Sequence, residues 1–245
     1  MSFSASEYVK DILLRKTDRD QSRRVGPSNL SNECTRCLAD DMLNAPREQG
    51  VYNMGAIVGT AIHAYLEERN LDELALREQS NTVGTIEGYG TIKGSTDLYL
   101  PQYGAILDFK TTTRDKLEKY KKADTYEPSK WDVEGVRIAR KTIERYFRQT
   151  QLYAMGMENA GYTPETLHII FLCRDGQIVD RDVYALQPRP YNHDTAKYIF
   201  LRAQNLWQFL ERGGDPEELN SDDDCYYCNR VRPYVTQTTQ EEVEL

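Results

Sequence analysis

Two aspartates and a lysine in the middle of the sequence have the types and spacing of a site that binds a divalent cation. Asp97 lies in one predicted strand, and Asp108 and Lys110 lie in the next, after a turn and an apolar run. Side chains two residues apart in a strand point to the same face, so Asp108 and Lys110 share a face. A carboxylate and an ammonium on one face of a buried strand are unfavourable unless they bind something. We interpret the three as the centre of a reactive site. The alternative is that Asp97 marks a turn and that Asp108 only pairs with Lys110.

Phosphodiester hydrolysis is a reaction that such a group could catalyse. It needs a metal ion that activates a water, a positive charge beside the phosphate, and stabilisation of the leaving oxygen. Two carboxylates with a histidine or a backbone carbonyl can hold Mg²⁺ or Mn²⁺. His63, in a predicted helix, is a candidate ligand, although a histidine in such a helix is more often part of the core. Lys110 would orient the attacking water or neutralise the developing charge.

Four of the five cysteines form two pairs with the spacing of metal ligands. Cys34 and Cys37 make one Cys-x-x-Cys pair, and Cys225 and Cys228 make the other. In a cytoplasmic protein, such pairs favour a metal site over disulfides. Four thiolates suit either a tetrahedral zinc ion or an iron–sulfur cluster. The fifth, Cys173, is predicted to be a small buried apolar side chain in a strand.

The hydrophobic pattern predicts an α/β fold, with a mixed central sheet of about five strands flanked by helices. Residues 1–235 are predicted to form one domain, and residues 236–245 a disordered acidic tail. Ser28 is the predicted N-cap of the second helix, and Gly161 the C-cap of the long one. Helices are predicted over residues 7–16, 28–44, 54–70, 114–122, 136–160 and 194–212. Strands are predicted over residues 74–80, 83–88, 90–100, 105–111, 166–173 and 177–186, with Asp175 and Gly176 as the last hairpin turn.

The composition is that of a soluble globular protein, and we expect it in the cytoplasm. No apolar run approaches the roughly 18 residues of a membrane span, and no apolar signal-peptide core is present at the start. The net charge of −8 argues against a general polyanion binder. The charge is uneven, because residues 110–148 hold twelve Lys or Arg against seven Asp or Glu, whereas residues 211–245 hold three against ten. A nucleic-acid surface would therefore be local, although a solvated helix face explains the first count as well.

The ordered set of motifs resembles the RecB-type branch of the PD-(D/E)xK nuclease superfamily. A Gly-x-x-x-His motif ends at His63, Gly-x-x-Asp ends at Asp97, Asp-x-Lys ends at Lys110, and a Gln-x-x-x-Tyr motif runs from Gln149 to Tyr153. The resemblance extends from about residue 28 to residue 161 and resumes at the terminal cysteines. It implies a restriction-endonuclease-like sheet that carries the catalytic site.

The same resemblance implies a role for each motif residue. The metal ligands would be His63, Asp97, Asp108 and the carbonyl of Phe109, and Lys110 would be the catalytic lysine. Gln149 and Tyr153 would lie beside the site and contact DNA or that lysine. Their structural alternatives are exposure to solvent for Gln149 and ordinary helix packing for Tyr153.

The cysteines resemble the iron–sulfur staple of several RecB-type nucleases, including AddB and the CRISPR-associated four-cysteine exonucleases, and the whole chain is most similar to the stand-alone CRISPR-associated or phage enzymes. Those proteins join one cysteine before the nuclease motifs to three after them, whereas this chain has two and two. The resemblance implies a [4Fe-4S] cluster, with Zn²⁺ as the alternative. Either would act as a structural staple between the N-terminal helix and the C-terminal tail. The ligands would be Cys34, Cys37, Cys225 and Cys228.

The resemblance implies a Mg²⁺- or Mn²⁺-dependent DNA exonuclease that acts on single-stranded DNA or DNA ends in phage or prokaryotic recombination or repair. No Gly-x-x-x-x-Gly-Lys-Ser/Thr motif is present, so unwinding would need a partner such as a helicase or recombinase. Tyr120, Tyr126 and Trp131 could stack on bases, or pack at the surface. Two alternatives remain: a non-catalytic DNA-binding accessory protein of the same fold, and a zinc-stabilised binding module without a catalytic metal.

Overall fold

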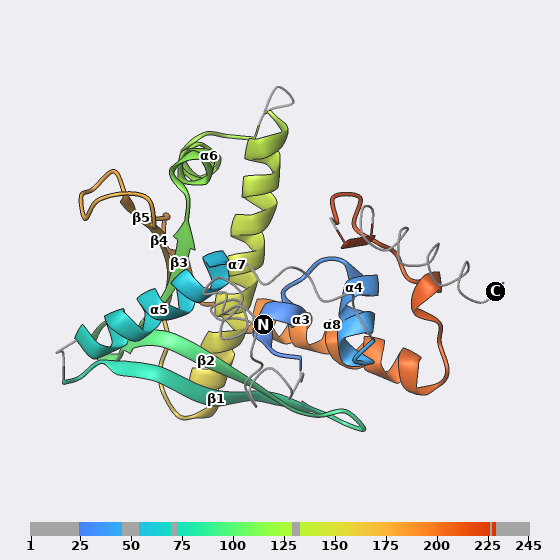
Figure 1. Cartoon of the computed structure of the whole chain (residues 1–245). Coiled ribbons are helices and arrows are strands. Elements are labelled where there is room, and N and C mark those ends of the chain that lie inside the picture. Colours follow the sequence, from blue (N-terminus) through green and yellow to red (C-terminus); the bar gives the residue numbers. More distant parts are fainter. Residues whose placement is uncertain (1–24, 46–53, 70–72, 129–132, 226, 229–245) are drawn as a thin grey trace, which may run out of the picture.

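A computed structural model describes residues 25–45, 54–69, 73–128, 133–225, 227 and 228 (Figure 1). They form a six-stranded mixed sheet in the order β1-β2-β3-β4-β5, with β6 also paired to β4. β1, β2 and β3 are antiparallel, β3 and β4 are parallel, and β5 and β6 are antiparallel to β4. The predicted mixed sheet is confirmed. The strands are β1 (Leu76–Ile86), β2 (Gly90–Leu100), β3 (Ala105–Thr112), β4 (Thr166–Cys173), β5 (Val183–Ala185) and β6 (Arg189–Pro190).

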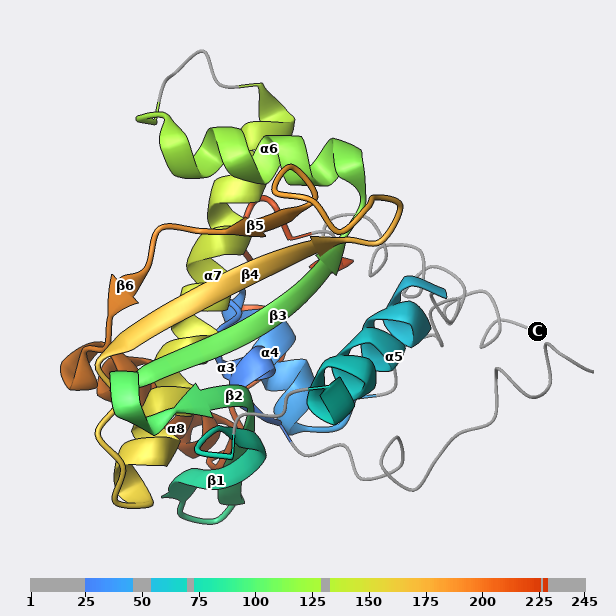
Figure 2. The ribbon, with the colours of Figure 1, turned by 90° about the vertical axis from the view of Figure 1, so that its left-hand side faces the viewer.

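Helices flank the sheet, as predicted. The long helix α7 runs behind β3 and β4 in Figure 2, whereas α5 lies on the opposite side, beside β3. The helices are α3 (Pro27–Leu30), α4 (Thr35–Met42), α5 (Met54–Arg69), α6 (Arg114–Thr125), α7 (Glu134–Asn159) and α8 (His193–Glu211), with 3₁₀ turns η1 (Pro101–Tyr103) and η2 (Pro216–Glu218). No helix in the described part of the chain is long and apolar enough to cross a membrane.

Helix α7 is central because it contributes to two hydrophobic clusters. Leu152 packs into a cluster formed with α4, α8 and the hairpin of β1 and β2. Ala154 and Met157 pack into a second cluster formed with α6, β3 and β4. Leu152, Ala154 and Met157 are each 0% exposed, and full burial of a side chain such as leucine or methionine contributes about 1.5–3 kcal/mol. One helix therefore fixes the sheet relative to the cysteine-bearing α4.

The predicted helix over residues 28–44 is two short helices. The N-cap of α3 is Gly26, not Ser28, and the helix ends at Ser31. The side-chain oxygen of Asn32 then accepts a hydrogen bond from the backbone N–H of Cys34 at 3.2 Å. Such local bonding by asparagine competes with the helical pattern, and α4 begins after Cys34 as its N-cap.

Two of the predicted strand boundaries are also wrong. The strands predicted over residues 74–80 and 83–88 are one strand, β1, with a bulge between Thr82 and Gly84. The strand predicted over residues 177–186 is only the three-residue β5. The segment between β4 and β5 is a longer loop and not a tight hairpin turn. The buried carboxylate of Asp182 holds this loop, because it accepts a hydrogen bond from the N–H of Gln177 at 2.8 Å and pairs with Arg114 at 2.8 Å. The helix predicted over residues 7–16 and the tail over residues 236–245 lie outside the described residues.

Candidate functional site

The predicted site lies where β2 and β3 separate. The two strands pair only from Leu98 with Leu107 to Leu100 with Ala105. Asp97 is the first residue of β2 beyond this pairing, and its Oδ2 accepts a hydrogen bond from the N–H of Phe109 at 2.7 Å. A side-chain carboxylate thus satisfies a backbone donor that a paired strand would otherwise satisfy. The side chain of Asp97 thus links β2 to β3 at the point where their backbone pairing ends.

Asp108 and Lys110 lie on the same face of β3, as predicted. Asp108 is 1% exposed, and the Nζ of Lys110 lies 2.8 Å from its Oδ2. Burial raises the pKa of Asp108 to about 6, against the opposing charge of Lys110. Burial alone would lower the pKa of Lys110, but the charge of Asp108 outweighs it and the pKa is raised. Asp108 and Lys110 thus form the salt bridge that the alternative interpretation predicted, but this salt bridge belongs to a larger group of polar side chains.

His63 belongs to this group and not to the hydrophobic core. Its Nδ1 lies 3.3 Å from Oδ1 of Asp97, and its side chain is 28% exposed. The hydrogen bond to Asp97 raises the pKa of His63 against the effect of burial. Its ring meets the ring of Phe109 edge-on, with the centroids 6.4 Å apart. The structure thus connects His63, Asp97 and Phe109 directly.

Glu78 is a candidate ligand that the sequence analysis missed. His63, Glu78 and Asp97 each offer a ligand atom within 4.8 Å of the other two. Asp108 is not part of this group, although it is a predicted ligand. The three residues also line a cavity of about 400 Å³ between α5 and the sheet. The donor set of one imidazole and two carboxylates suits a divalent cation such as Mn²⁺ or Mg²⁺.

A bulge brings Glu78 to the site. At the hairpin end of β1, Ile86 pairs with Gly90, and this register would place Glu78 opposite Leu98. The bulge after Thr82 shifts the register by one residue, so that Glu78 lies opposite Asp97. Glu78 also has a φ of 46°, which is uncommon for a residue other than glycine. No sequence pattern in the strand indicates the bulge.

Helix α7 places Gln149 and Tyr153 next to this site. The residues are one helical turn apart, and the side-chain amide of Gln149 donates a hydrogen bond to the Tyr153 hydroxyl. Gln149 is 8% exposed, so its predicted alternative of solvent exposure is wrong. Burial, followed by the charge of Asp108, raises the pKa of Tyr153 to about 12. Tyr146, a further residue of the same helix, has its ring 4.9 Å from the Nζ of Lys110. Tyr146 lies seven residues, or two helical turns, before Tyr153, and this spacing places both side chains on the same face of the helix.

The basic segment is less free to bind DNA than its composition indicates. Tyr120 stacks on Phe171 with the centroids 4.3 Å apart and the rings at 11°. The prediction that Tyr120 stacks on bases is therefore wrong, and its packing alternative holds. Tyr126 is exposed, and Trp131 lies outside the described residues. Several cations of this segment pair with acidic side chains of later segments: Arg114 with Asp182, Arg137 with Asp224, and Lys141 with Asp222 and Asp224.

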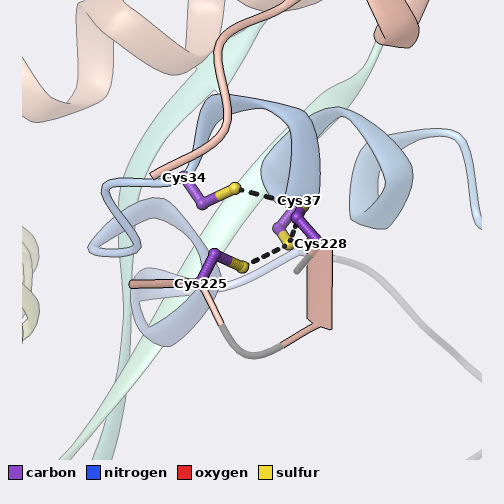
Figure 3. A group of neighbouring side chains, drawn as sticks. All are labelled: Cys34, Cys37, Cys225 and Cys228. Carbon is purple, nitrogen blue, oxygen red and sulfur yellow. Dashed lines mark hydrogen bonds between the residues drawn. The ribbon is translucent and has the colours of Figure 1, made fainter. Parts of the chain in front are cut away.

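The four predicted cysteine ligands form one cluster. Their sulfur atoms point toward one another in Figure 3, and all four lie within 4.8 Å of one another. The Sγ distances are 3.5 Å from Cys34 to Cys228, 3.3 Å from Cys37 to Cys225, and 3.5 Å from Cys37 to Cys228. No disulfide joins them. Cys173 lies outside this group and is only partly buried, which differs from its predicted burial.

Comparison with known proteins gives a match by structure and not by sequence. No protein family matches the sequence, and no curated protein does. The alkaline exonuclease LHK-Exo from Laribacter hongkongensis has a similar structure, with a TM-score of 0.51 and 13% identity over 79% of this chain and 91% of that one. A phage-related exonuclease from Haemophilus somnus 129PT has a TM-score of 0.45 and 13% identity, over 86% of this chain and 91% of that one. SSO0001 has a TM-score of 0.44 and 16% identity, over 82% of this chain and 83% of that one.

The similarity to LHK-Exo extends over most of both chains, and it concerns the arrangement of helices and strands. The mixed sheet and its flanking helices agree with the fold that the motif series implies. The chain therefore has a fold similar to that of the alkaline exonuclease LHK-Exo.

Proposed function

We propose that the protein is a metal-dependent deoxyribonuclease that removes nucleotides from single-stranded DNA or DNA ends. The observation that carries this proposal is the convergence of His63, Glu78 and Asp97 beside the buried Asp108–Lys110 pair. The fold shared with an alkaline exonuclease supports it. We place the activity in recombination or repair of phage or prokaryotic DNA in the cytoplasm, with any unwinding supplied by a separate helicase.

The residues of the site divide into ligands and positioning groups. His63, Glu78 and Asp97 would hold Mg²⁺ or Mn²⁺. The resemblance to RecB-type nucleases adds the side chain of Asp108 and the carbonyl of Phe109 to the proposed ligand set. When bound, this ion would activate a water and polarise the phosphate. Because Asp97 also holds the N–H of Phe109, it fixes the backbone that carries the next residue, Lys110.

Lys110 would supply the positive charge. Asp108 keeps its ammonium protonated, and the ring of Tyr146 adds a cation–π contact at 4.9 Å. From this position Lys110 would donate a hydrogen bond to the attacking water or to a phosphate oxygen. We propose that Gln149 and Tyr153 position Lys110 and that they do not bind DNA at the surface, because Gln149 is 8% exposed.

Replacement of Asp97 by asparagine tests the function. Asparagine keeps an oxygen that accepts from the N–H of Phe109 but removes the charge that holds the metal. We expect a loss of nucleotide release from end-labelled linear DNA of about 10²–10³-fold, a size typical for one preorganised electrostatic group. Single- and double-stranded substrates with Mg²⁺, Mn²⁺ or EDTA give the measurement. The exposed Asp115→Asn on α6 is the matched control and should retain activity.

A covalently closed DNA circle separates exonuclease from endonuclease activity. Cleavage of the circle at the rate of the linear substrate would refute the requirement for ends. Absence of hydrolysis by the wild type with either metal would refute the enzyme altogether. Such a result would favour a non-catalytic DNA-binding accessory protein, in which Lys110 and Asp108 form only a structural salt bridge.

Replacement of Glu78 by glutamine tests whether Glu78 is a metal ligand. We expect the Mn²⁺ concentration for half-maximal activity to rise at least about tenfold, because even an outer-sphere partner of a metal ligand contributes about 10–100-fold in affinity. Glu67→Gln is the matched control, since Glu67 lines the same cavity but is not part of the ligand group. Equal metal requirements in the two variants would exclude Glu78 as a ligand.

A further inference from the structure

The four cysteine sulfurs lie too close together for the iron–sulfur cluster that the resemblance implies, and we propose that they hold one tetrahedral zinc ion. The inference concerns a site separate from the proposed catalytic residues and does not depend on the nuclease function. It rests on the distances between the sulfurs, on the two Cys-x-x-Cys pairs, and on the contacts that fix the segments carrying them.

The distances separate the two metal centres. One zinc ion with Zn–S bonds of about 2.3 Å places its four sulfurs about 3.8 Å apart. A [4Fe-4S] cluster binds each thiolate to a different iron, so four irons and four sulfides lie between the thiolates and hold them about 6 Å apart. In this protein all four sulfurs lie within 4.8 Å of one another, and three of the distances are 3.3–3.5 Å. These distances are much closer to those around one zinc ion than to those around a [4Fe-4S] cluster.

The spacing along the chain is that of a closed structural zinc site. Each pair has the short separation that such sites use, and four thiolates complete a tetrahedron without an open position. Cys34 is the N-cap of α4 and Cys37 lies in its first turn, so both sulfurs leave the same end of the helix. Cys34, Cys37 and Cys228 are 1%, 3% and 8% exposed. The arrangement is enclosed, as a structural ion requires.

Contacts on both sides hold the two halves of the cluster close together. On one side, Leu38 of α4 is 0% exposed in the core formed with α7 and α8. On the other side, Lys141 of α7 lies 2.9 Å from Asp222 and 2.6 Å from Asp224, directly before Cys225. Arg36 of α4 also donates to the carbonyls of Glu217 at 2.8 Å and Leu219 at 3.1 Å. These contacts fix the backbone on both sides of the cluster, whereas a [4Fe-4S] cluster would need the sulfurs to lie about 6 Å apart.

Metal content tests the inference. The full chain is produced in medium with both iron and zinc and purified without oxygen, so that an iron–sulfur cluster would survive. We expect one zinc per chain, no acid-labile sulfide, a colourless protein, and X-ray absorption at the zinc edge that shows four sulfurs at about 2.3 Å. About four irons and four sulfides per chain with a broad visible absorbance would overturn the inference, and so would a chain without bound metal.

Three variants assign the zinc to this site. Cys225→Ser should lose most of the zinc, whereas Cys173→Ser should retain it because Cys173 lies outside the cluster. Asp97→Asn should also retain it, which excludes zinc bound at the proposed catalytic site. If Cys225→Ser does not fold, the wild-type absorption spectrum still decides between four sulfur ligands and any other set. Loss of nuclease activity in Asp97→Asn with unchanged zinc would separate the two sites.

Discussion

Replacement of Lys110 by alanine should reduce DNA hydrolysis by about 10²–10³-fold. The ammonium of Lys110 is the positive charge paired with the buried Asp108, and alanine leaves no group in its place. Because Lys110 would act on the reacting phosphate and not on the rest of the DNA, affinity for DNA in Ca²⁺ should change little. Single-turnover hydrolysis of end-labelled DNA measures the first quantity, and fluorescence anisotropy measures the second.

The same substitution should lower stability, and the pH dependence of this loss has a definite sign. Removal of one partner of a buried ion pair costs about 3–5 kcal/mol when the other charge remains. Burial already raises the pKa of Asp108 to about 6, and without Lys110 it should rise further. A carboxyl group with a raised pKa in the folded state destabilises that state as the pH rises above its unfolded value of about 3.9. Urea unfolding in EDTA should therefore show a larger loss at pH 8 than at pH 5.

Two controls separate chemistry from folding. Lys93→Ala removes an exposed lysine from the neighbouring strand β2 and should leave both activity and stability unchanged. Lys110→Gln keeps a donor for Asp108 but removes the charge, so it should restore part of the stability and none of the activity. A Lys110→Ala enzyme with more than a tenth of wild-type activity at pH 6, where Asp108 is easily protonated, would show that Lys110 is a structural residue.

The two-residue period of strands was sufficient to predict which side chains of the site share a face. It placed Asp108 and Lys110 together and Phe109 opposite, and β3 has this arrangement. Gln149 and Tyr153 are four residues apart and so share one face of α7, where the side-chain amide of Gln149 donates to the Tyr153 hydroxyl. These contacts depend only on local backbone geometry, which the sequence pattern indicates directly.

Contacts that depend on irregular backbone could not be predicted in the same way. The position of Glu78 opposite Asp97 results from a one-residue bulge after Thr82, and a regular hairpin would have placed it elsewhere. At the break between α3 and α4, the side chain of Asn32 accepts a hydrogen bond from the N–H of Cys34, and the helical composition of the segment does not indicate this bond. In both cases a single local deviation changes the partners of residues far along the chain.

The cysteines show a different limit. Their spacing correctly predicted that two distant pairs would meet, because Cys-x-x-Cys favours a shared ligand set. Spacing along the chain does not determine how far apart the sulfurs lie in space, however, and zinc and an iron–sulfur cluster differ in that distance. In this protein the contacts of Lys141 and Arg36 hold the two cysteine-bearing segments close together, and these contacts involve residues outside the motif.

Removal of the proposed zinc ion should lower the midpoint of thermal unfolding by roughly 8–16 °C. A ligand at about 1,000 times its dissociation constant stabilises the folded state by about 4.1 kcal/mol, and each kcal/mol shifts the midpoint by about 2–4 °C in a chain of this size. The segment that ends at Cys228 would lose the metal link to α4 and keep its hydrogen bonds to Arg36 and its ion pairs with Lys141. Ion pairs near the surface contribute about 0–1 kcal/mol each, which is less than the ion would contribute.

Scanning calorimetry of the wild type with and without a zinc-selective chelator, in excess Mg²⁺, gives this measurement. Cys34→Ser should have a similarly low midpoint that no longer responds to the chelator, because Cys34 is 1% exposed and within the cluster. Cys173→Ser, which removes a sulfur outside the cluster, should respond as the wild type does. DNA hydrolysis well below the midpoint should survive chelation, since the cysteines contribute no group to the site of Asp97 and Lys110. An unchanged midpoint after complete loss of zinc would show that the ion does not hold α4 and the segment of Cys225 and Cys228 together.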